Sequence, residues 1–180
     1  MNRAVAVIPL IIFSLLMAIW AGWLRIGWSI PLTGAAGMHG CLMVNSFLAS
    51  LIFLERAVTC KSKWWLALPV VHASSALAFA LQFTSLGYLL VTLGRMGFLV
   101  LCGYFIYRYK ELYYYVFFAG AFCLLMGNGI LYGKHDYPAA APWWMGFLLF
   151  TIVAERLELS RFLSLTSIKK GLLVVFLLRS

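Results

Sequence analysis

Long apolar runs separated by short polar breaks dominate this chain. Six runs are predicted to be helices, at residues 4–24, 38–57, 64–82, 86–107, 112–132 and 142–159. Each run is close to the roughly 20 residues that an α-helix needs to cross the hydrocarbon core of a bilayer. The pattern therefore predicts an all-α fold, a polytopic transmembrane bundle of about six helices.

The composition supports a membrane protein and excludes an ordinary soluble domain. Of the 180 residues, 64% are hydrophobic and only 11% are charged, and the mean hydropathy is +0.98. Soluble proteins carry about a quarter charged residues. The net charge of +9 does not indicate a nucleic-acid partner, because most basic residues lie in short loops between the apolar runs. The predicted partner is the lipid bilayer.

The loop charges predict the topology. Ten basic residues fall on one side: Arg3, Arg56, Lys61, Lys63, Arg108, Lys110, Arg156, Arg161, Lys169 and Lys170. The other side has only Arg25 and Lys134. By the positive-inside rule, the N-terminus and the end of the sixth helix are cytoplasmic.

The predicted domain organisation is one six-helix transmembrane domain at residues 1–163, followed by a different segment at 164–180. Residues 164–170 form a polar basic linker, and the apolar run of 171–178 stops after eight residues, which is too short to span. The chain is therefore expected to be the front part of a longer protein whose further helices are missing, or a member of a homo-oligomer.

A sequence pattern recurs with an offset of 100 residues. Residues 47–56 and 147–156 both read F-L-x-x-x-I-x-x-E-R. Both helices are predicted to run from outside to inside, so the two Glu-Arg pairs share one depth. The match favours a parallel repeat of about four helices, although apolar helices also share letters by chance.

The two Glu-Arg pairs are candidates for structural ion pairs. Neighbouring residues on one helix point in different directions, so Glu55 and Arg56 are expected to pair reciprocally with Glu155 and Arg156 across the second and sixth helices. The alternative is a proton path that Glu158 would extend.

Soft and imidazole donors collect at the outer end of the second run. His39 and Met43 lie one turn apart, with Cys41 between them. Such ligands suit copper(I) or haem iron, although methionine in an apolar helix is more often a packing residue. His135, in the outer loop before the sixth run, is within reach of His39 and completes the candidate metal set.

His72 and Arg95 are the ionisable residues predicted near the midplane. His72 is offset from His39 by about 15 Å of helix rise, so the two histidines cannot share one metal ion. Arg95 needs an anion there, because no carboxylate of the chain is predicted at its depth. A haem propionate, a bound anion or a missing helix could supply it, and the alternative is snorkelling to water.

The sequence lacks motifs for covalent haem attachment and for soluble hydrolase or nucleotide chemistry. The four cysteines show neither C-x-x-C nor C-x-x-C-H spacing, so any haem is expected to be noncovalent haem b. There is no P-loop, G-x-S-x-G or H-E-x-x-H motif. No catalytic residue can be named.

Two segments resemble the NnrS-like bacterial membrane proteins. The first is residues 37–44, G-M-H-G-C-L-M-V, followed by Phe47-Leu48 and residues 55–58, E-R-A-V. The second is residues 142–144, P-W-W, followed by F-L, T-I and E-R-L-E-L-S-R up to residue 161. Family members are longer than this chain and have further histidines in later helices.

The resemblance implies a helix layout similar to the haem-copper oxidase core subunit, haem and copper binding, and a role in the response to nitric oxide in the bacterial inner (cytoplasmic) membrane. It makes His39 the first candidate ligand and His72 the second, with Arg95 for a propionate. The first functional hypothesis is therefore a haem-binding or metal-binding protein in nitric oxide response or electron transfer. The alternatives are a transporter or assembly subunit with an anion or proton path through Arg95 and His72, and a truncated fragment without activity.

Overall fold

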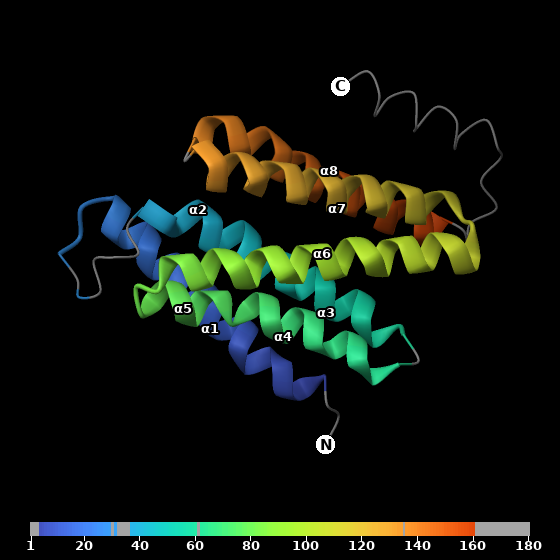
Figure 1. Cartoon of the computed structure of the whole chain (residues 1–180), viewed down its shortest axis with the longest axis horizontal. Coiled ribbons are helices and arrows are strands. Elements are labelled where there is room, and N and C mark those ends of the chain that lie inside the picture. Colours follow the sequence, from blue (N-terminus) through green and yellow to red (C-terminus); the bar gives the residue numbers. More distant parts are fainter. Residues whose placement is uncertain (1–3, 30, 32–36, 61, 135, 161–180) are drawn as a thin grey trace. The chain divides into compact units, whose positions relative to one another are not determined.

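The computed structural model describes residues 4–29, 31, 37–60, 62–134 and 136–160. Every element in these ranges is a helix (Figure 1). The predicted all-α class is therefore confirmed for the described part of the chain. The predicted linker and apolar run of residues 164–180 lie outside the described residues.

Five helical segments are long and apolar enough to cross a membrane. They are Val5–Arg25 (η1, Val5–Val7, and α1, Ile8–Arg25), His39–Val58 (α2, His39–Cys41, η3, Leu42–Ala49, and α3, Ser50–Val58), α6 (Thr84–Tyr109), α7 (Leu112–Lys134) and α8 (Tyr137–Ser160). The first four agree with the predicted runs to within two residues at each end.

Helix α8 begins five residues before the run predicted at 142–159. The Asp136 side chain accepts a hydrogen bond from the backbone N–H of Ala139 at 3.1 Å, which caps the new N-terminus. Pro138 is tolerated because the first backbone N–H groups of a helix have no helical partner. A second proline, Pro142, lies inside the helix.

The predicted third helix, 64–82, is present in three pieces rather than one. They are η4 (Lys63–Leu66), α4 (Ala67–Ala73) and α5 (Ser75–Ala80), and α4 and α5 are separated by a turn at Ser74. Gln82 follows α5 with φ +64°, a left-handed conformation that ends the helix before α6. No single α-helix of spanning length forms here.

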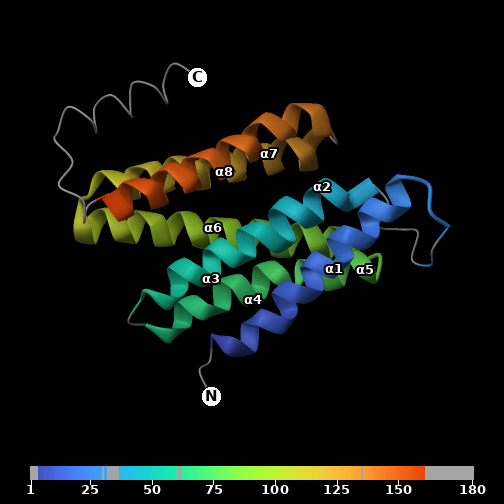
Figure 2. The same cartoon turned by 180° about the vertical axis from the view of Figure 1, so that it is seen from behind.

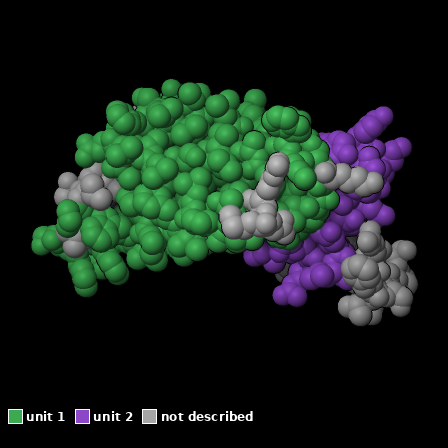
Figure 3. Space-filling view, turned by 90° about the horizontal axis from the view of Figure 1, so that it is seen from below, with its two compact units in different colours: residues 1–101, 132–135 green, residues 102–131, 136–180 purple. Residues whose placement is uncertain are grey.

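The chain divides into two compact units (Figure 3). One boundary lies inside α6, after Leu101, and another lies inside α7, after Leu131. Unit 1 is residues 1–101 with 132–135, and unit 2 is residues 102–131 with 136–180. In unit 1, α1 packs against η3 and α3 packs against α4. Helices α3 and α4 lie side by side in both views (Figures 1 and 2).

Three glycines of α6 let α4, α5 and their side chains approach closely within unit 1. A Cβ at Gly87, Gly94 or Gly97 would collide with Phe79, His72 or Leu68, respectively. Small residues at such contacts are the usual way in which membrane helices approach one another. The contact at Gly94 matters most, because it seats a histidine against the helix backbone.

Unit 2 contains its own interhelical hydrogen bond. Trp144 of α8 donates its indole N–H to Oδ1 of Asn128 on α7 at 3.1 Å. Gly127 lies beneath the same indole ring, where a Cβ would come within 2.8 Å of Trp144. This hydrogen bond joins α7 to α8.

The two halves of the 100-residue offset differ in burial. Arg56 is buried whereas Arg156 is exposed, and Phe47 is half-buried whereas Phe147 is fully buried. The local backbone differs too, because residues 42–49 form a π-helix and α8 is α-helical throughout. Identical residues in the two segments therefore have different structural environments.

Replacing Gly94 by alanine is expected to destabilise the protein by about 1–3 kcal/mol, because the new methyl group overpacks against the His72 ring. The matched control is Gly103→Ala in the same helix, where a Cβ meets no atom within 4 Å. This control should be neutral or slightly stabilising. Thermal unfolding of the two variants in detergent measures the difference, and equal Tm values would contradict the packing.

Candidate functional site

Buried polar side chains gather in the interior of unit 1. We define the polar cluster as Cys41, Asn45, Ser46, His72, Ser75 and Arg95. All six side chains are at most 3% exposed. They come from α2, η3, α4, α5 and α6. A polar group in an apolar interior is costly unless it is satisfied, so each member needs a partner.

The second span is a π-helix where it carries the cluster. Residues Leu42–Ala49 form η3, a π-helix that places both Asn45 and Ser46 in the buried interior. π-Helical turns are rare and are frequently found at functional sites. Asn45 donates from its side-chain amide to the sulfur of Cys41 at 3.6 Å.

The facing helix is interrupted at the same place, at Ser74. The interruption removes helical donors from the carbonyls of His72 and Ala73, and serine hydroxyls replace them. Ser75 donates to the His72 carbonyl at 2.6 Å. The single hydroxyl proton of Ser14 on α1 is shared between the Leu10 carbonyl of its own helix at 3.0 Å and the Ala73 carbonyl at 3.3 Å. Side chains that satisfy freed backbone groups make such a break tolerable inside a membrane.

A hydrogen bond between hydroxyls joins the π-helix to the broken helix. Ser46 Oγ and Ser75 Oγ are 2.8 Å apart. A hydroxyl has one proton, and Ser75 uses its proton on the His72 carbonyl. Ser46 is therefore the donor of the Ser46–Ser75 hydrogen bond, and the two irregular helices are coupled beside His72.

His72 is fully enclosed, and its ring nitrogens have no hydrogen bond. Phe53 lies 4.7 Å from the imidazole, centroid to centroid, and stacks in turn on Phe98 of α6 at 4.1 Å. The carbonyls of Asn45 and Val91 face the ring, but neither meets hydrogen-bond geometry with Nδ1 or Nε2. Two unpaired buried nitrogens on one side chain are exceptional in a folded protein.

Arg95 lies next to Gly94, on which His72 packs. Its Nε donates to the Val91 carbonyl at 2.9 Å, and one terminal nitrogen lies 3.5 Å from the Thr92 hydroxyl. Both partners are neutral groups of its own helix. Its charge also acts on His72 and on the Cys41 thiol, so the three groups are electrostatically coupled.

His39 has different surroundings from His72. Its Nδ1 is 2.8 Å from the Ala18 carbonyl of α1. Gly22 leaves room for the ring, because a Cβ at this position would lie 3.1 Å from Nδ1 of His39. His72 instead contacts Phe53 and Gly94. The structure therefore places the two histidines against different helices.

The candidate metal set is only partly described. Met43 lies half-buried in η3, and His135 lies outside the described residues. Within the described ranges, no three side chains of histidine, cysteine, aspartate or glutamate come together to hold a metal ion. Burial raises the pKa of the Cys60 thiol, which follows the second long helical segment.

Glu55 and Arg56 pair with each other. A terminal nitrogen of Arg56 donates to Oε1 of Glu55 at 3.0 Å, so these neighbours do not point apart as expected. The flexible arginine side chain curls back to its neighbour. The predicted reciprocal pairs with Glu155 and Arg156 join residues of different units and stay predictions.

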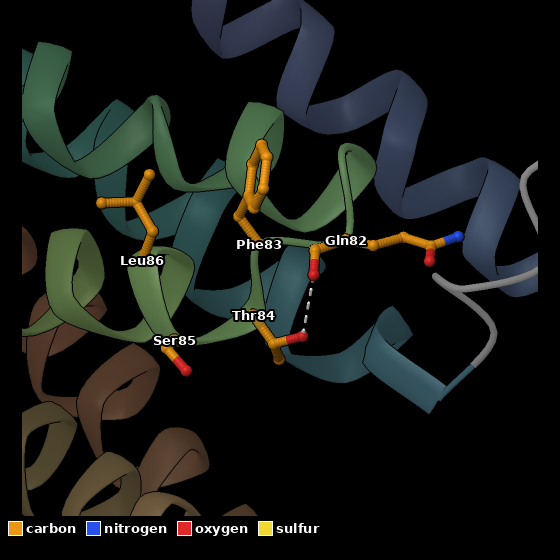
Figure 4. A pocket seen from close by; sticks show the side chains of 5 residues that line it. All are labelled: Gln82, Phe83, Thr84, Ser85 and Leu86. Carbon is orange, nitrogen blue, oxygen red and sulfur yellow. Dashed lines mark hydrogen bonds between the residues drawn. The ribbon is translucent and has the colours of Figure 1, made fainter.

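A shallow open hollow lies between α5 and α6. Its volume is about 500 Å³ and its lining is Gln82, Phe83, Thr84, Ser85 and Leu86 (Figure 4). Thr84 Oγ1 lies 3.4 Å from the Gln82 carbonyl. Five consecutive residues with no charged group offer little chemistry, so the polar cluster is the better candidate site.

Comparison with known families gives one match, to residues 3–179, and its description is a domain of unknown function, DUF8744. The chain belongs to the DUF8744 family. No curated protein and no solved structure matches it. The polar cluster of this DUF8744 chain must therefore be interpreted from its own chemistry.

His72, Arg95 and Cys41 stand out in the sequence, but Asn45, Ser46 and Ser75 do not. Asn45 and Ser46 are adjacent polar residues inside an apolar run, which is a usable signal for a buried polar position. The π-helix has no signal in the letters. α6 is continuous through the two glycines Gly94 and Gly97, and the break is at Ser74 instead.

The Ser46–Ser75 hydrogen bond is expected to couple the two helices energetically. Ser46→Ala and Ser75→Ala should each destabilise the DUF8744 chain by about 1–2 kcal/mol, because each removes a buried hydrogen bond. The double variant should cost less than the sum of the two. A double-mutant cycle on unfolding in detergent measures this, and strict additivity would contradict the coupling.

Proposed function

We propose that this chain is a membrane transporter or channel subunit whose polar cluster binds a small monovalent anion. The observation that supports the proposal is the buried charge of Arg95, which is 3% exposed and has only neutral described partners. An uncompensated charge in an apolar interior costs several kcal/mol. A bound anion at the guanidinium removes most of that cost.

The acidic residues of the chain are poorly placed to neutralise Arg95. There are five, at positions 55, 111, 136, 155 and 158. All lie near a helix end or between helices, whereas Arg95 is near the middle of the 26-residue helix α6. Glu55 is already paired with Arg56.

The irregular helices around the cluster support an anion path. Transporter sites near the bilayer midplane are commonly built from interrupted helices, because irregular backbone is tolerated where it lines a site. Here the π-helix Leu42–Ala49 and the break at Ser74 flank His72. If these two segments served only for packing, two regular α-helices would be sufficient.

The proposed topology has six spans with the N-terminus in the cytoplasm of a bacterial cell. In this proposal the interrupted segment of η4, α4 and α5 also crosses the membrane, as the third span in chain order. It is added to the five long helical segments. The support is the charge bias of the loops, with ten basic residues on one side and two on the other. The repeat with an offset of 100 residues belongs to the same proposal.

Anion binding is tested by thermal unfolding of the purified protein in detergent with sodium chloride, nitrate, nitrite or formate, each balanced against gluconate. At saturation, at least one anion should raise Tm by roughly 5 °C, because a ligand of the folded state stabilises it. Arg95→Gln should abolish that rise. Arg108→Gln, an exposed arginine at the end of the same helix, should retain it.

The anion-free Tm of Arg95→Gln provides a second test. If Arg95 is an unpaired buried charge, the neutral amide should leave Tm unchanged or raise it. A large fall in Tm without anion, or an anion response that survives in Arg95→Gln, contradicts the proposal.

A second candidate function is haem b or copper binding at His39, in nitric oxide response or electron transfer as for NnrS-like proteins. Its support is the contact between Nδ1 and the Ala18 carbonyl at 2.8 Å. A ligating histidine commonly donates its second nitrogen to such a carbonyl, which leaves Nε2 for the metal. His39 would hold the group, and the bound metal would supply the redox or nitric oxide chemistry. The chain's own part is to orient the imidazole against Gly22.

This second function predicts a Soret band that shifts on dithionite reduction in protein purified from haem-replete cells, or copper by metal analysis. His39→Ala should abolish the signal, because it removes the proposed ligand. His72→Ala is the comparison, since that ring is enclosed by Phe53 and Gly94. A colourless, copper-free protein would eliminate this candidate and leave the anion site unaffected.

A further inference from the structure

The surroundings of His72 are arranged for two protonation states. The carbonyls of Asn45 and Val91 both face the imidazole, and neither ring nitrogen has a hydrogen bond. A neutral imidazole has only one N–H, so it can serve at most one of two acceptors. An imidazolium has two N–H donors and could serve both.

Arg95 opposes that second proton. The guanidinium acts on His72 across the Gly94 contact, and a second buried positive charge beside the first is unfavourable. Cys41 of α2 and Tyr88 of α6 also face the cluster, and a thiol and a phenol are ordinarily uncharged at neutral pH. Arg56 lies one turn beyond Phe53 on α3 and is paired with Glu55. The η3 and α5 members are the uncharged Asn45, Ser46 and Ser75.

We propose that each anion bound at Arg95 is accompanied by one proton on His72. This inference rests on the proposed anion site and adds its coupling. The anion cancels the charge of Arg95, and the imidazole then accepts a proton from solvent and donates to the two carbonyls. The empty and loaded clusters carry the same net charge. Binding and transfer of the anion are therefore electroneutral and driven by pH.

The π-helix and the Ser74 break give this coupling a structural consequence. The carbonyl of Asn45 belongs to the π-helix, and the carbonyl of His72 accepts from Ser75 at the break. Protonated His72 would draw the Asn45 carbonyl into a hydrogen bond. A change of charge at one ring thereby acts on both irregular helices, which the Ser46–Ser75 hydrogen bond already joins.

The test is proton uptake by the detergent-purified full chain in weak buffer upon addition of sodium chloride, nitrate, nitrite or formate. All four anions are fully ionised above about pH 6, so they carry no proton themselves. The wild type should take up close to one proton per bound anion. Between about pH 6 and pH 8, the affinity should strengthen close to tenfold for each unit fall in pH.

His72→Gln should bind the anion with an affinity that does not change with pH, and without proton uptake. The control Glu111→Gln removes an exposed titratable group and should behave as the wild type. Anion binding by the wild type with no proton uptake and no pH dependence overturns the coupling and leaves the anion site standing. Absence of binding for all four anions overturns the anion site itself. If His72→Gln does not fold, the proton stoichiometry of the wild type decides alone.

Discussion

The cost of holding one positive charge inside an apolar helix bundle constrains the rest of unit 1. Arg95 is near the middle of its helix and is almost completely buried. Its described hydrogen bonds go back to the preceding turn of α6. In a low-dielectric interior such a charge is stable only if other interactions offset the free energy of its desolvation. Hydrogen bonds to backbone carbonyls alone offset little of that free energy. The polar groups around Arg95 are most simply understood as one solution to this problem.

Several local irregularities converge on that charge. Gly94 lets the His72 ring lie against the α6 backbone, which puts the imidazole next to the guanidinium. The π-helix turns Asn45 and Ser46 inward, and the break at Ser74 frees carbonyls that serines then satisfy. Each feature alone weakens a regular membrane helix. Together they build a polar interior that two straight, apolar helices could not provide.

The fold class and most helix ends could be predicted from the sequence because membrane helices depend mainly on length and hydropathy. The same reasoning failed for residues 64–82, because hydropathy does not register a break at which the Ser75 hydroxyl donates to the freed His72 carbonyl. It also missed the early start of α8, since the Asp136 cap is a local contact that no apolar run contains.

The candidate site was predictable in part, for a clear physical reason. An arginine and a histidine inside apolar runs are recognisable candidates, because burying an ionisable side chain in a membrane is energetically unfavourable. Their partners are harder to predict, since Asn45 lies in a π-helix that the letters of the sequence do not signal. The contact of Gly94 with His72 depends on tertiary packing. Residue type identified Arg95 and His72 as buried polar groups, and the folded structure was needed to identify their neighbours.

The central claim is that an anion neutralises Arg95 inside the bundle. The most direct measurement is anomalous diffraction from crystals of the protein grown in sodium bromide. The account predicts an anomalous peak within hydrogen-bonding distance of the Arg95 guanidinium, on the side of His72. A guanidinium bonded to a carboxylate, with no bromide density in the polar cluster, would contradict it.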